Sequence, residues 1–345
     1  MRYKLFGRSG LRVSELGLGT MTFGEEWGWG ASKEECRKIF DAFAEAGGNF
    51  IDTANRYTEG TSERFVGEFI GADRDAFVVA TKYTLFSRRD HPNASGNHRK
   101  NMVTSLEGSL RRLRTDYIDL LWVHAWDFLT PTDEVLRGLD DLVRAGKVLY
   151  IGVSDTPAWV VSHANTLAEL RGWTRFVGLQ IKYGLIERTP EQDLLPMARC
   201  FDLAVVPWGV LGGGLLTGKY NRDPDAKGRI AGTKTLNERN LRIAEEVSAV
   251  AEEHGCTPSQ AAISWVRVQP GVIVPLIGAR TEAQLRDALG ALDISLSEVH
   301  LRRLSEVSAV QPAFPHNFLS SPNIRELVYG GFADRIDDHR GGRTL

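Results

Sequence analysis

Eight short runs of β-branched and apolar residues recur along the chain, and a segment with helical periodicity follows each run. The runs are Leu16–Thr20, Phe50–Thr53, Phe77–Thr81, Ile118–Val123, Val148–Val153, Val177–Ile181, Ala204–Pro207 and Val272–Ile277. The amphipathic segments between them include Ser32–Ala46, Arg99–Leu113, Thr132–Ala145 and Thr281–Leu289. Alternating strands and helices are typical of a parallel sheet, and eight such units suit a closed barrel. We therefore predict an α/β fold with a single (β/α)8 TIM barrel.

An open doubly wound sheet is the alternative, but the chain lacks the G-x-G-x-x-G loop that follows the first strand of such sheets. Instead Gly17–Met21 continues into Trp- and Gly-rich sequence with no helix start. The helix signals elsewhere are clear. Ser32, followed three residues later by Glu35, predicts a capping box, and Gly47, Gly48 and Gly146 are expected to end helices.

Three parts of the chain lie outside the repeating units. Residues 3–13, interrupted by Gly7-Arg8-Ser9-Gly10, predict a β-hairpin that could close the bottom of the barrel. A long Gly/Asp/Lys-rich loop at 212–236 is expected to be functional or mobile. The tail, with an extra C-terminal helix, is expected to lie over the barrel mouth or to fray. The predicted boundaries are 1–14 for the hairpin, 15–310 for the barrel and 311–345 for the tail.

Composition excludes several function classes. The net charge is −2, from 42 Lys and Arg against 44 Asp and Glu, so we expect no nucleic-acid partner. No apolar run reaches the ~18 residues of a membrane span, and the first residues lack a signal-peptide pattern. The three cysteines lie far apart and form no metal-binding motif, so we expect no metal and no disulfide framework. A cytoplasmic protein is predicted.

Ionisable residues stand where three of the first four strands should end. Asp52 follows Phe50-Ile51, Lys82 follows Val78–Thr81, and His124 follows Leu120–Val123. In a barrel these strand ends meet at the C-terminal mouth, where barrel enzymes have their active sites. Tyr57, five residues after Asp52, lies on the next loop. A single charged strand end is usually a solvated loop residue, but three of them with a nearby tyrosine indicate a catalytic site.

The four residue types make chemical sense as a unit. A free tyrosine has a pKa near ~10, and a neighbouring lysine cation is expected to lower it. The carboxylate of Asp52 would keep Lys82 charged. A histidine at the rim can hydrogen-bond a carbonyl oxygen and orient it.

Several motifs resemble the aldo-keto reductase superfamily. They are Gly17-Leu18-Gly19-Thr20-Met21, Asn49–Tyr57 (NFIDTANRY), Ala80-Thr81-Lys82-Tyr83 and Val123-His124, and the resemblance extends over residues 1 to 310. It implies reduction of a small-molecule carbonyl compound with NADPH/NADP⁺ as cofactor. It also implies that Asp52, Tyr57, Lys82 and His124 are the catalytic tetrad, with Tyr57 as the proton donor.

The same resemblance implies where the cofactor binds. Ser154 and Gln180 would hold the nicotinamide carboxamide, and Trp208 would stack on its ring. The segment Gly209–Leu215 would cradle the pyrophosphate, with Lys219 closing over it, and Arg280 would suit a 2′-phosphate. The full predicted set is Gly19, Thr20, Met21, Asp52, Ser154, Asp155, Gln180, Trp208, Gly209, Val210, Leu211, Gly213, Leu215, Lys219, Gly278, Ala279, Arg280, Gln284 and Asp287.

Two departures from the superfamily pattern stand out. Asp155 occupies a position where many members carry Asn, and Asp287-Ala288 replaces a Glu-Asn pair expected at adenine. The stretches Gly146–Trp159 and Pro207–Gly214 look most like the aryl-alcohol dehydrogenase branch. Trp27, Trp29, Phe86 and Trp126 follow strands one, three and four, so they could line an aromatic substrate pocket or simply pack the loops.

Two alternative functions stay open at this level. One is a reductase dedicated to a ketosugar or polyketide biosynthetic intermediate. The other is a non-catalytic NADPH-binding protein like the potassium-channel β-subunits, which share this barrel. The sequence leaves the oligomeric state open and allows a homo-oligomer.

Overall fold

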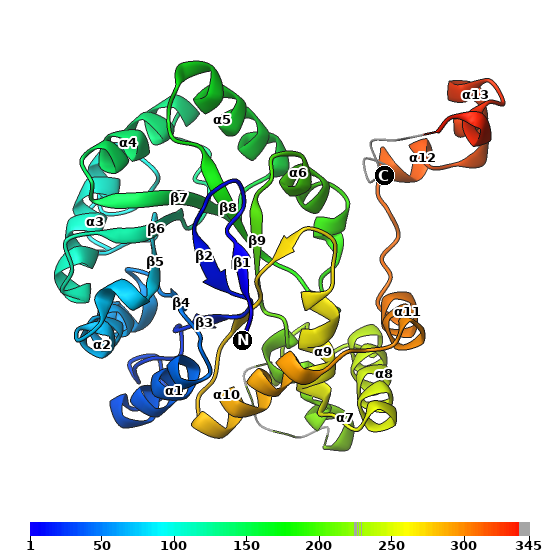
Figure 1. Ribbon diagram of the computed structural model, residues 1–345, viewed down its shortest axis with the longest axis horizontal. Coiled ribbons are helices and arrows are strands. Elements are labelled where there is room, and N and C mark those ends of the chain that lie inside the picture. The colour runs from blue at the N-terminus through cyan, green and yellow to red at the C-terminus, as the bar shows by residue number, and fades with distance from the viewer. Residues whose placement is uncertain (224–225, 227, 229, 338–345) are drawn as a thin grey trace.

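The computed structural model, which describes residues 1–223, 226, 228 and 230–337, contains a ring of parallel strands surrounded by helices (Figure 1). The strands of the ring are β3 (Gly17–Gly19), β4 (Phe50–Asp52), β5 (Val78–Tyr83), β6 (Ile118–Val123), β7 (Val148–Ser154), β8 (Phe176–Lys182), β9 (Ala204–Trp208), β10 (Val272–Ile273) and β11 (Leu276–Ile277). Each of the eight predicted runs overlaps one of these strands or, in the last case, two.

The last run closes the barrel. β10 pairs with β9, whereas β11, two residues later, pairs with β3 at the other edge of the sheet. Val274 N donates to Val205 O at 2.8 Å, and Pro275 O accepts from Gly17 N at 3.0 Å, so the connection continues the ladder from one neighbour to the other. Proline has no N–H to donate, which explains why the predicted strand Val272–Ile277 is divided here. The sheet is therefore a closed eight-unit barrel, as predicted.

Helices cover the outside of the ring in Figure 1. They are α1 (Lys33–Glu45), α2 (Thr61–Ile70), α3 (Arg99–Leu113), α4 (Thr132–Arg144), α5 (Ala158–Arg171), α6 (Leu194–Cys200), α8 (Glu238–His254), α9 (Pro258–Arg267), α10 (Glu282–Leu289) and α11 (Glu298–Val307).

The predicted cap Ser32 accepts from Glu35 N at 3.4 Å. The other half of the predicted capping box is absent, because the Glu35 carboxylate accepts from Glu282 N at 2.8 Å and so links α1 to α10.

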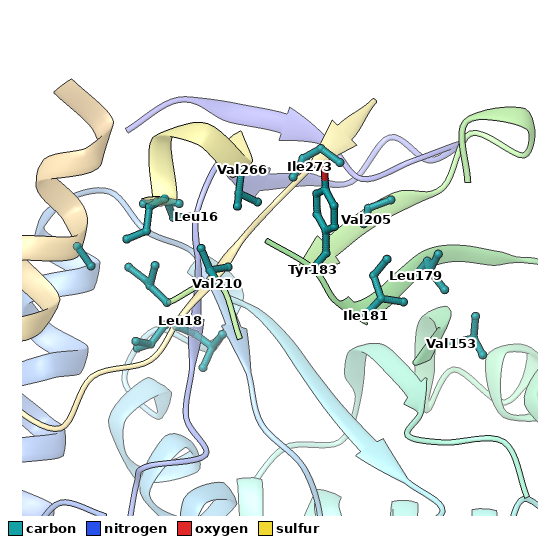
Figure 2. Packing of buried hydrophobic residues seen from close by; sticks show 14 of the residues in the cluster. Leu16, Leu18, Val153, Leu179, Ile181, Tyr183, Val205, Val210, Val266 and Ile273 are labelled. Carbon is teal, nitrogen blue, oxygen red and sulfur yellow. The ribbon is translucent and has the colours of Figure 1, made fainter. Parts of the chain in front are cut away.

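Strand side chains alternate between two apolar layers. Outward-facing residues such as Leu179 and Ile181 of β8 and Val205 of β9 pack with helix residues such as Val266 of α9 (Figure 2). A second, smaller cluster fills the barrel interior: Phe6, Val13, Phe50, Val78, Ala80, Leu120, Trp122, Ala204, Val206 and Val274. Because this layer plugs the lower interior, polar side chains can occupy only the opposite end.

The predicted N-terminal hairpin consists of β1 (Tyr3–Leu5) and β2 (Arg12–Ser14), and it lies across the end of the barrel in Figure 1. Phe6 enters the interior, with its ring 5.6 Å from that of Phe50 and 6.3 Å from that of Trp122. Gly7 has a φ of +58°, and a Cβ there would lie 2.3 Å from Val177 O, so only glycine fits. The hairpin thus closes the bottom of the barrel.

The C-terminal segment differs from the prediction. Residues 311–337 include two short helices, α12 (His316–Leu319) and α13 (Pro322–Tyr329), which stand apart from the barrel in Figure 1 and not over its mouth. The predicted end of the tail, 338–345, lies outside the described residues, as do 224, 225, 227 and 229 of the predicted loop. The rest of that loop includes a 3-10 segment (Gly212–Thr217) and α7 (Lys219–Arg222). Among the described helices, none has the length and apolar character needed to cross a bilayer.

Candidate active site

Neighbouring strands bring the four predicted catalytic residues together. Asp52 is the last residue of β4 and pairs in register with Ala80 of β5, two residues before Lys82. His124 directly follows β6, and its backbone N–H donates to Tyr83 O at 3.2 Å. Tyr57 begins the 3-10 segment Tyr57–Gly60 after β4. All four side chains therefore belong to the C-terminal mouth of the barrel, opposite the hairpin.

Lys82 is fully buried, and its ammonium group is surrounded by acceptors. Nζ donates to Asp52 Oδ2, to Thr53 O at 2.8 Å and to the Tyr57 hydroxyl at 3.1 Å. An ammonium has three N–H groups, so these contacts satisfy it completely. The cation is thus held beside the phenol oxygen without access to bulk water.

Asp52 is held from a second direction, which the sequence analysis did not foresee. Gln180, at the end of β8, donates from Nε2 to Asp52 Oδ1 at 2.8 Å. Both side chains point into the barrel from strands that are not neighbours, and only the closed barrel brings them together. Gln180 was predicted to contact the cofactor, and the structure gives it this additional role.

The pKa of Tyr57 differs from the expectation. Burial raises it above the ordinary value of a tyrosine, and the Lys82 cation, which acts in the opposite direction, does not outweigh burial and the Asp52 charge. Lys82 therefore lowers the pKa of Tyr57 as predicted, but burial, which the sequence analysis did not take into account, makes the net change a rise. The phenol keeps its proton at neutral pH, which is the state that a proton donor needs.

The other three groups have perturbed pKa values as well. Burial disfavours the Lys82 cation, but the Asp52 carboxylate outweighs it and raises the pKa of Lys82. Burial raises the pKa of Asp52 even though Lys82 opposes this. Burial, with a smaller contribution from Lys82, lowers the pKa of His124 to about 3. His124 is therefore a neutral imidazole at physiological pH, with its ring centroid 5.9 Å from that of Tyr57.

A buried hydroxyl group behind the site, Ser62 of α2, was missed in the sequence analysis. Ser62 Oγ lies 2.8 Å from Thr20 Oγ1 and 2.9 Å from Thr53 Oγ1, and it donates to Thr20 O at 2.8 Å. It therefore joins the ends of β3 and β4, including the residue whose carbonyl binds Lys82. A serine in a first helical turn gives no signal for this role, because serine there is usually a solvated or capping residue.

The predicted nicotinamide residues lie on the next three strand ends. Ser154 of β7 pairs in register with Gln180 of β8, and Trp208 ends β9. Asp155 adopts a left-handed φ of +42°, which is uncommon for a residue other than glycine. Trp208 Nε1 donates to Asp155 Oδ1 at 3.2 Å. The strained residue is therefore tied to the predicted stacking platform.

The predicted pyrophosphate segment has the backbone of an anion cradle. Gly209, Gly212, Gly213 and Gly214 all have positive φ, and a Cβ at Gly213 would lie 2.7 Å from Ile230. Successive backbone N–H groups in such turns form concavities that bind phosphate. Val210 and Leu215 are buried, so only their backbones can serve a ligand. The Lys219 side chain lies beside this segment, because its Cε is 3.9 Å from the position that a Cβ at Gly214 would occupy.

The predicted adenosine end lies before α10. Arg280 is exposed, and the described residues include no ion-pair partner for its guanidinium. Its backbone N–H donates to Gln284 Oε1 at 3.0 Å, while Thr22 Oγ1 donates to Ala279 O at 2.6 Å. Asp287 accepts from Thr257 Oγ1 at 2.8 Å and from Gln260 Nε2, so its carboxylate already binds the start of α9.

Three of the four predicted substrate aromatics are linked to one another, and one of them, Trp27, contacts Tyr57. The Trp27 ring centroid lies 6.4 Å from that of Tyr57 and 5.6 Å from that of Trp29. Phe86 joins them through Arg56, whose Cζ is 4.4 Å from the Phe86 ring centroid. Trp126, two residues after His124, is half-buried and packs against the outer apolar layer. It has the predicted position, but no contact with the other three is seen within the described parts of the chain.

This arrangement suits proton transfer to an oxygen atom at the barrel mouth. It combines a protonated phenol, a buried cation that stabilises the phenolate, and a neutral imidazole beside them. Over residues 1–223, 226, 228 and 230–337, no group of three or more His, Cys, Asp or Glu side chains is placed to hold a metal ion.

Comparisons with known proteins identify the family of the chain. The family model described as "Aldo/keto reductase family" matches residues 15–309. A norsolorinic acid reductase of Aspergillus flavus is 40% identical over 327 residues, covering 91% of this chain and 83% of the relative. An aryl-alcohol dehydrogenase [NADP(+)] of Phanerodontia chrysosporium is 40% identical, covering 93% and 89%, and a putative aryl-alcohol dehydrogenase of Saccharomyces cerevisiae is 39% identical, covering 90% and 87%. The chain is therefore an oxidoreductase that belongs to the aldo/keto reductase family.

Proposed function

We propose that this protein is an NADPH-dependent reductase of aldehydes and ketones, aromatic ones in particular, in which Tyr57 donates the proton. The observation that carries the proposal is the buried chain from Asp52 through Lys82 to the Tyr57 hydroxyl at the open end of the barrel. The choice of NADPH as the cofactor is supported by a relative that is named aryl-alcohol dehydrogenase [NADP(+)].

The residues present fit such a cofactor. Ser154 and Gln180 would hold the carboxamide, Trp208 would stack on the nicotinamide, and the glycine-rich segment 209–214 would bind the pyrophosphate through backbone N–H groups. Exposed Arg280 would bind a 2′-phosphate, because a guanidinium pairs well with phosphate oxygens. When bound, the cofactor supplies the hydride that reaches the carbonyl carbon.

The remaining chemistry belongs to the side chains. His124, a neutral imidazole, hydrogen-bonds the carbonyl oxygen and orients it toward Tyr57. The Tyr57 hydroxyl gives its proton to that oxygen and becomes a phenolate. Lys82 stabilises the phenolate charge at 3.1 Å, and Asp52 keeps Lys82 in place and charged. The buried cation thus makes a weak acid competent at neutral pH.

A turnover assay tests the proposal. The purified protein, NADPH and a panel of aromatic, aliphatic and sugar carbonyl compounds are combined, and NADPH oxidation is followed with alcohol formation. We expect turnover that is fastest with aromatic aldehydes. Cofactor binding without turnover of any compound would instead support a role like that of the channel β-subunits.

A second candidate is a reductase dedicated to one biosynthetic intermediate. The 40% identity with a protein named norsolorinic acid reductase favours it. This candidate predicts a low kcat/KM for every simple aldehyde in the panel and a much higher value for norsolorinic acid.

A further inference from the structure

Two arginines contact the same aromatic ring, that of Phe86, near Tyr57. Arg56, the residue before Tyr57, has its Cζ 4.4 Å from the Phe86 ring centroid and 5.9 Å from that of Trp27. Arg89 Cζ also lies 4.4 Å from the Phe86 centroid. We call Trp27, Arg56, Glu59, Phe86 and Arg89 the arginine–aromatic wall.

The wall lies at the reacting end of the barrel. Trp27 meets Tyr57 edge to face, with ring centroids 6.4 Å apart. The loop that carries Phe86 and Arg89 begins at Thr84, whose hydroxyl accepts from His124 N at 3.3 Å. A ligand whose carbonyl oxygen reaches Tyr57 and His124 would therefore have the wall beside it.

The wall has one more cation than anions. Glu59 is paired with Arg56, and it also accepts from Trp27 Nε1 at 3.2 Å. The hydrogen bond from Arg56 holds the pKa of Glu59 below its ordinary value, so this carboxylate is charged. Arg89 is exposed and forms no ion pair with any residue in the described part of the chain. Its neighbour Arg88, by contrast, is paired with Asp90 at 3.0 Å.

Glu26, which directly precedes Trp27, is a further anion next to the wall, and it accepts from Thr61 Oγ1. Two other charged residues at the mouth, Asp155 and Lys182, lie away from the wall. Asp155 follows β7, three strands around the barrel from β4, and is bonded to Trp208. Lys182 ends β8 with Nζ 5.9 Å from the Trp208 ring centroid. They form a separate group of opposite charges on the side of the predicted nicotinamide site.

We propose that the wall selects aromatic carbonyl compounds that carry an anionic group, such as a carboxylate, with Arg89 as the residue that binds it. The proposal rests on the proposed function and specifies its substrate class. Trp27 and Phe86 offer faces for a flat ring, which favours offset stacking. The guanidinium of Arg89 offers a planar pair of N–H donors that matches a carboxylate, whereas Arg56 is already paired with Glu59.

A pair of substrates of nearly the same shape tests the proposal: 4-carboxybenzaldehyde, an anion at pH 7, and 4-formylbenzamide, which is neutral. We expect kcat/KM to be about 10-fold higher for the carboxylate, a modest factor because the site is exposed. Arg89→Gln should lower this ratio about 10-fold. The matched control Arg88→Gln removes a neighbouring arginine that is already paired, and the ratio should stay as in the unmutated protein.

The two substituents also differ in their electronic effect on the aldehyde, so the ratio in Arg89→Gln serves as the reference. Added salt should reduce kcat/KM for the carboxylate more than for the amide. A ratio that Arg89→Gln leaves unchanged, or that Arg88→Gln lowers equally, would overturn the proposal and leave the reductase assignment intact. Failure to reduce either compound, together with every aldehyde of the wider panel, would contradict the proposed function itself.

Discussion

Lys82 is the residue on which the chemistry of the candidate site depends. A fully buried ammonium is costly unless every N–H is bonded and a counter-charge is near. Here a carboxylate, a backbone carbonyl and a phenol satisfy it. Removal of Asp52 would leave the buried cation without a counter-charge, and removal of Lys82 would do the same to the buried carboxylate. In the proposed mechanism Asp52 therefore acts through Lys82, because no contact between Asp52 and the phenol is seen among the described residues.

His124 gives a prediction for the pH dependence of stability. Its pKa is about 3 in the folded protein and near ~6.5 in an unfolded chain. Below pH ~6.5 the unfolded chain binds a proton that the folded protein does not, so the free energy of unfolding falls as the pH decreases from there toward 3.

Thermal melts between pH 4 and pH 8 measure this effect. His124→Gln should make the fall of Tm below pH ~6.5 shallower than in the unmutated protein. The control is His163→Gln, which replaces an exposed histidine of α5. Identical slopes in all three proteins would show that burial does not lower the pKa of His124.

Arg280 gives a prediction for cofactor choice. Its exposed guanidinium before α10 should bind a 2′-phosphate, so NADPH should bind more tightly than NADH. Arg280→Ala should narrow the difference by about 1.5 kcal/mol, the lower end for hydrogen bonds to charged groups, because the side chain is exposed. Equilibrium titrations of both cofactors measure it. Arg286→Ala, which removes an exposed arginine of α10 already paired with Glu282, should leave the difference unchanged. Equal affinities in the unmutated protein would contradict the assignment of Arg280.

At the scale of elements, α2 (Thr61–Ile70) positions the catalytic strands from behind. Ser62 joins Thr20 and Thr53, and the adjacent residue Glu63 accepts from Thr81 Oγ1 at 2.5 Å. Thr53 directly follows Asp52, and Thr81 directly precedes Lys82. The first turn of α2 thus contacts Thr53 and Thr81, which adjoin Asp52 and Lys82 in the sequence.

Ser62→Ala tests this role. It would leave the Thr53 hydroxyl without the partner seen in the structure, and an unsatisfied buried polar group costs about 1–3 kcal/mol of unfolding free energy. We expect that loss in urea denaturation, together with a lower kcat and little change in cofactor affinity. Ser109→Ala, another buried serine whose Oγ contacts Arg112 at 3.5 Å, should have a smaller effect on both quantities. An unchanged stability and kcat in Ser62→Ala would remove α2 from this role.

The element scale also shows what could be predicted from sequence. Strand and helix periodicities are local, so all eight strand runs and helices such as 99–113 were predictable. The division of the last strand at Pro275 was missed although proline gives a local signal for it. The bond from Glu282 N to Glu35 was missed because Glu282 lies far along the chain. The same reason explains why the contacts of Ser62 and the Gln180–Asp52 bond were missed. The raised pKa of Tyr57 was missed because the extent of burial cannot be read from spacing.

At the scale of the whole molecule, the barrel has two ends with different roles. Phe6 and the hairpin fill one end with apolar side chains, and Gly7 lets the backbone approach Val177 and Asp202 closely. The other end carries the buried ion pair, the aromatic residues and the glycine-rich segment. In this fold the N-terminal end of the barrel usually contributes to stability, and the C-terminal mouth usually carries the active site. The C-terminal helices α12 and α13 stand apart from both ends (Figure 1).

The central claim is that one site transfers hydride from NADPH to a carbonyl carbon while Tyr57 protonates the oxygen. It is tested most directly with NADPH that carries deuterium at both C4 positions and with 4-methoxybenzaldehyde, by mass spectrometry of the alcohol. The unmutated protein should place one deuterium in the alcohol for each NADPH oxidised. Tyr57→Phe should bind NADPH with unchanged Kd yet form the same alcohol ~10²-fold more slowly or worse, because general acid catalysis contributes about 10²–10⁴. Alcohol without deuterium, or a near-normal rate in Tyr57→Phe, would contradict the account.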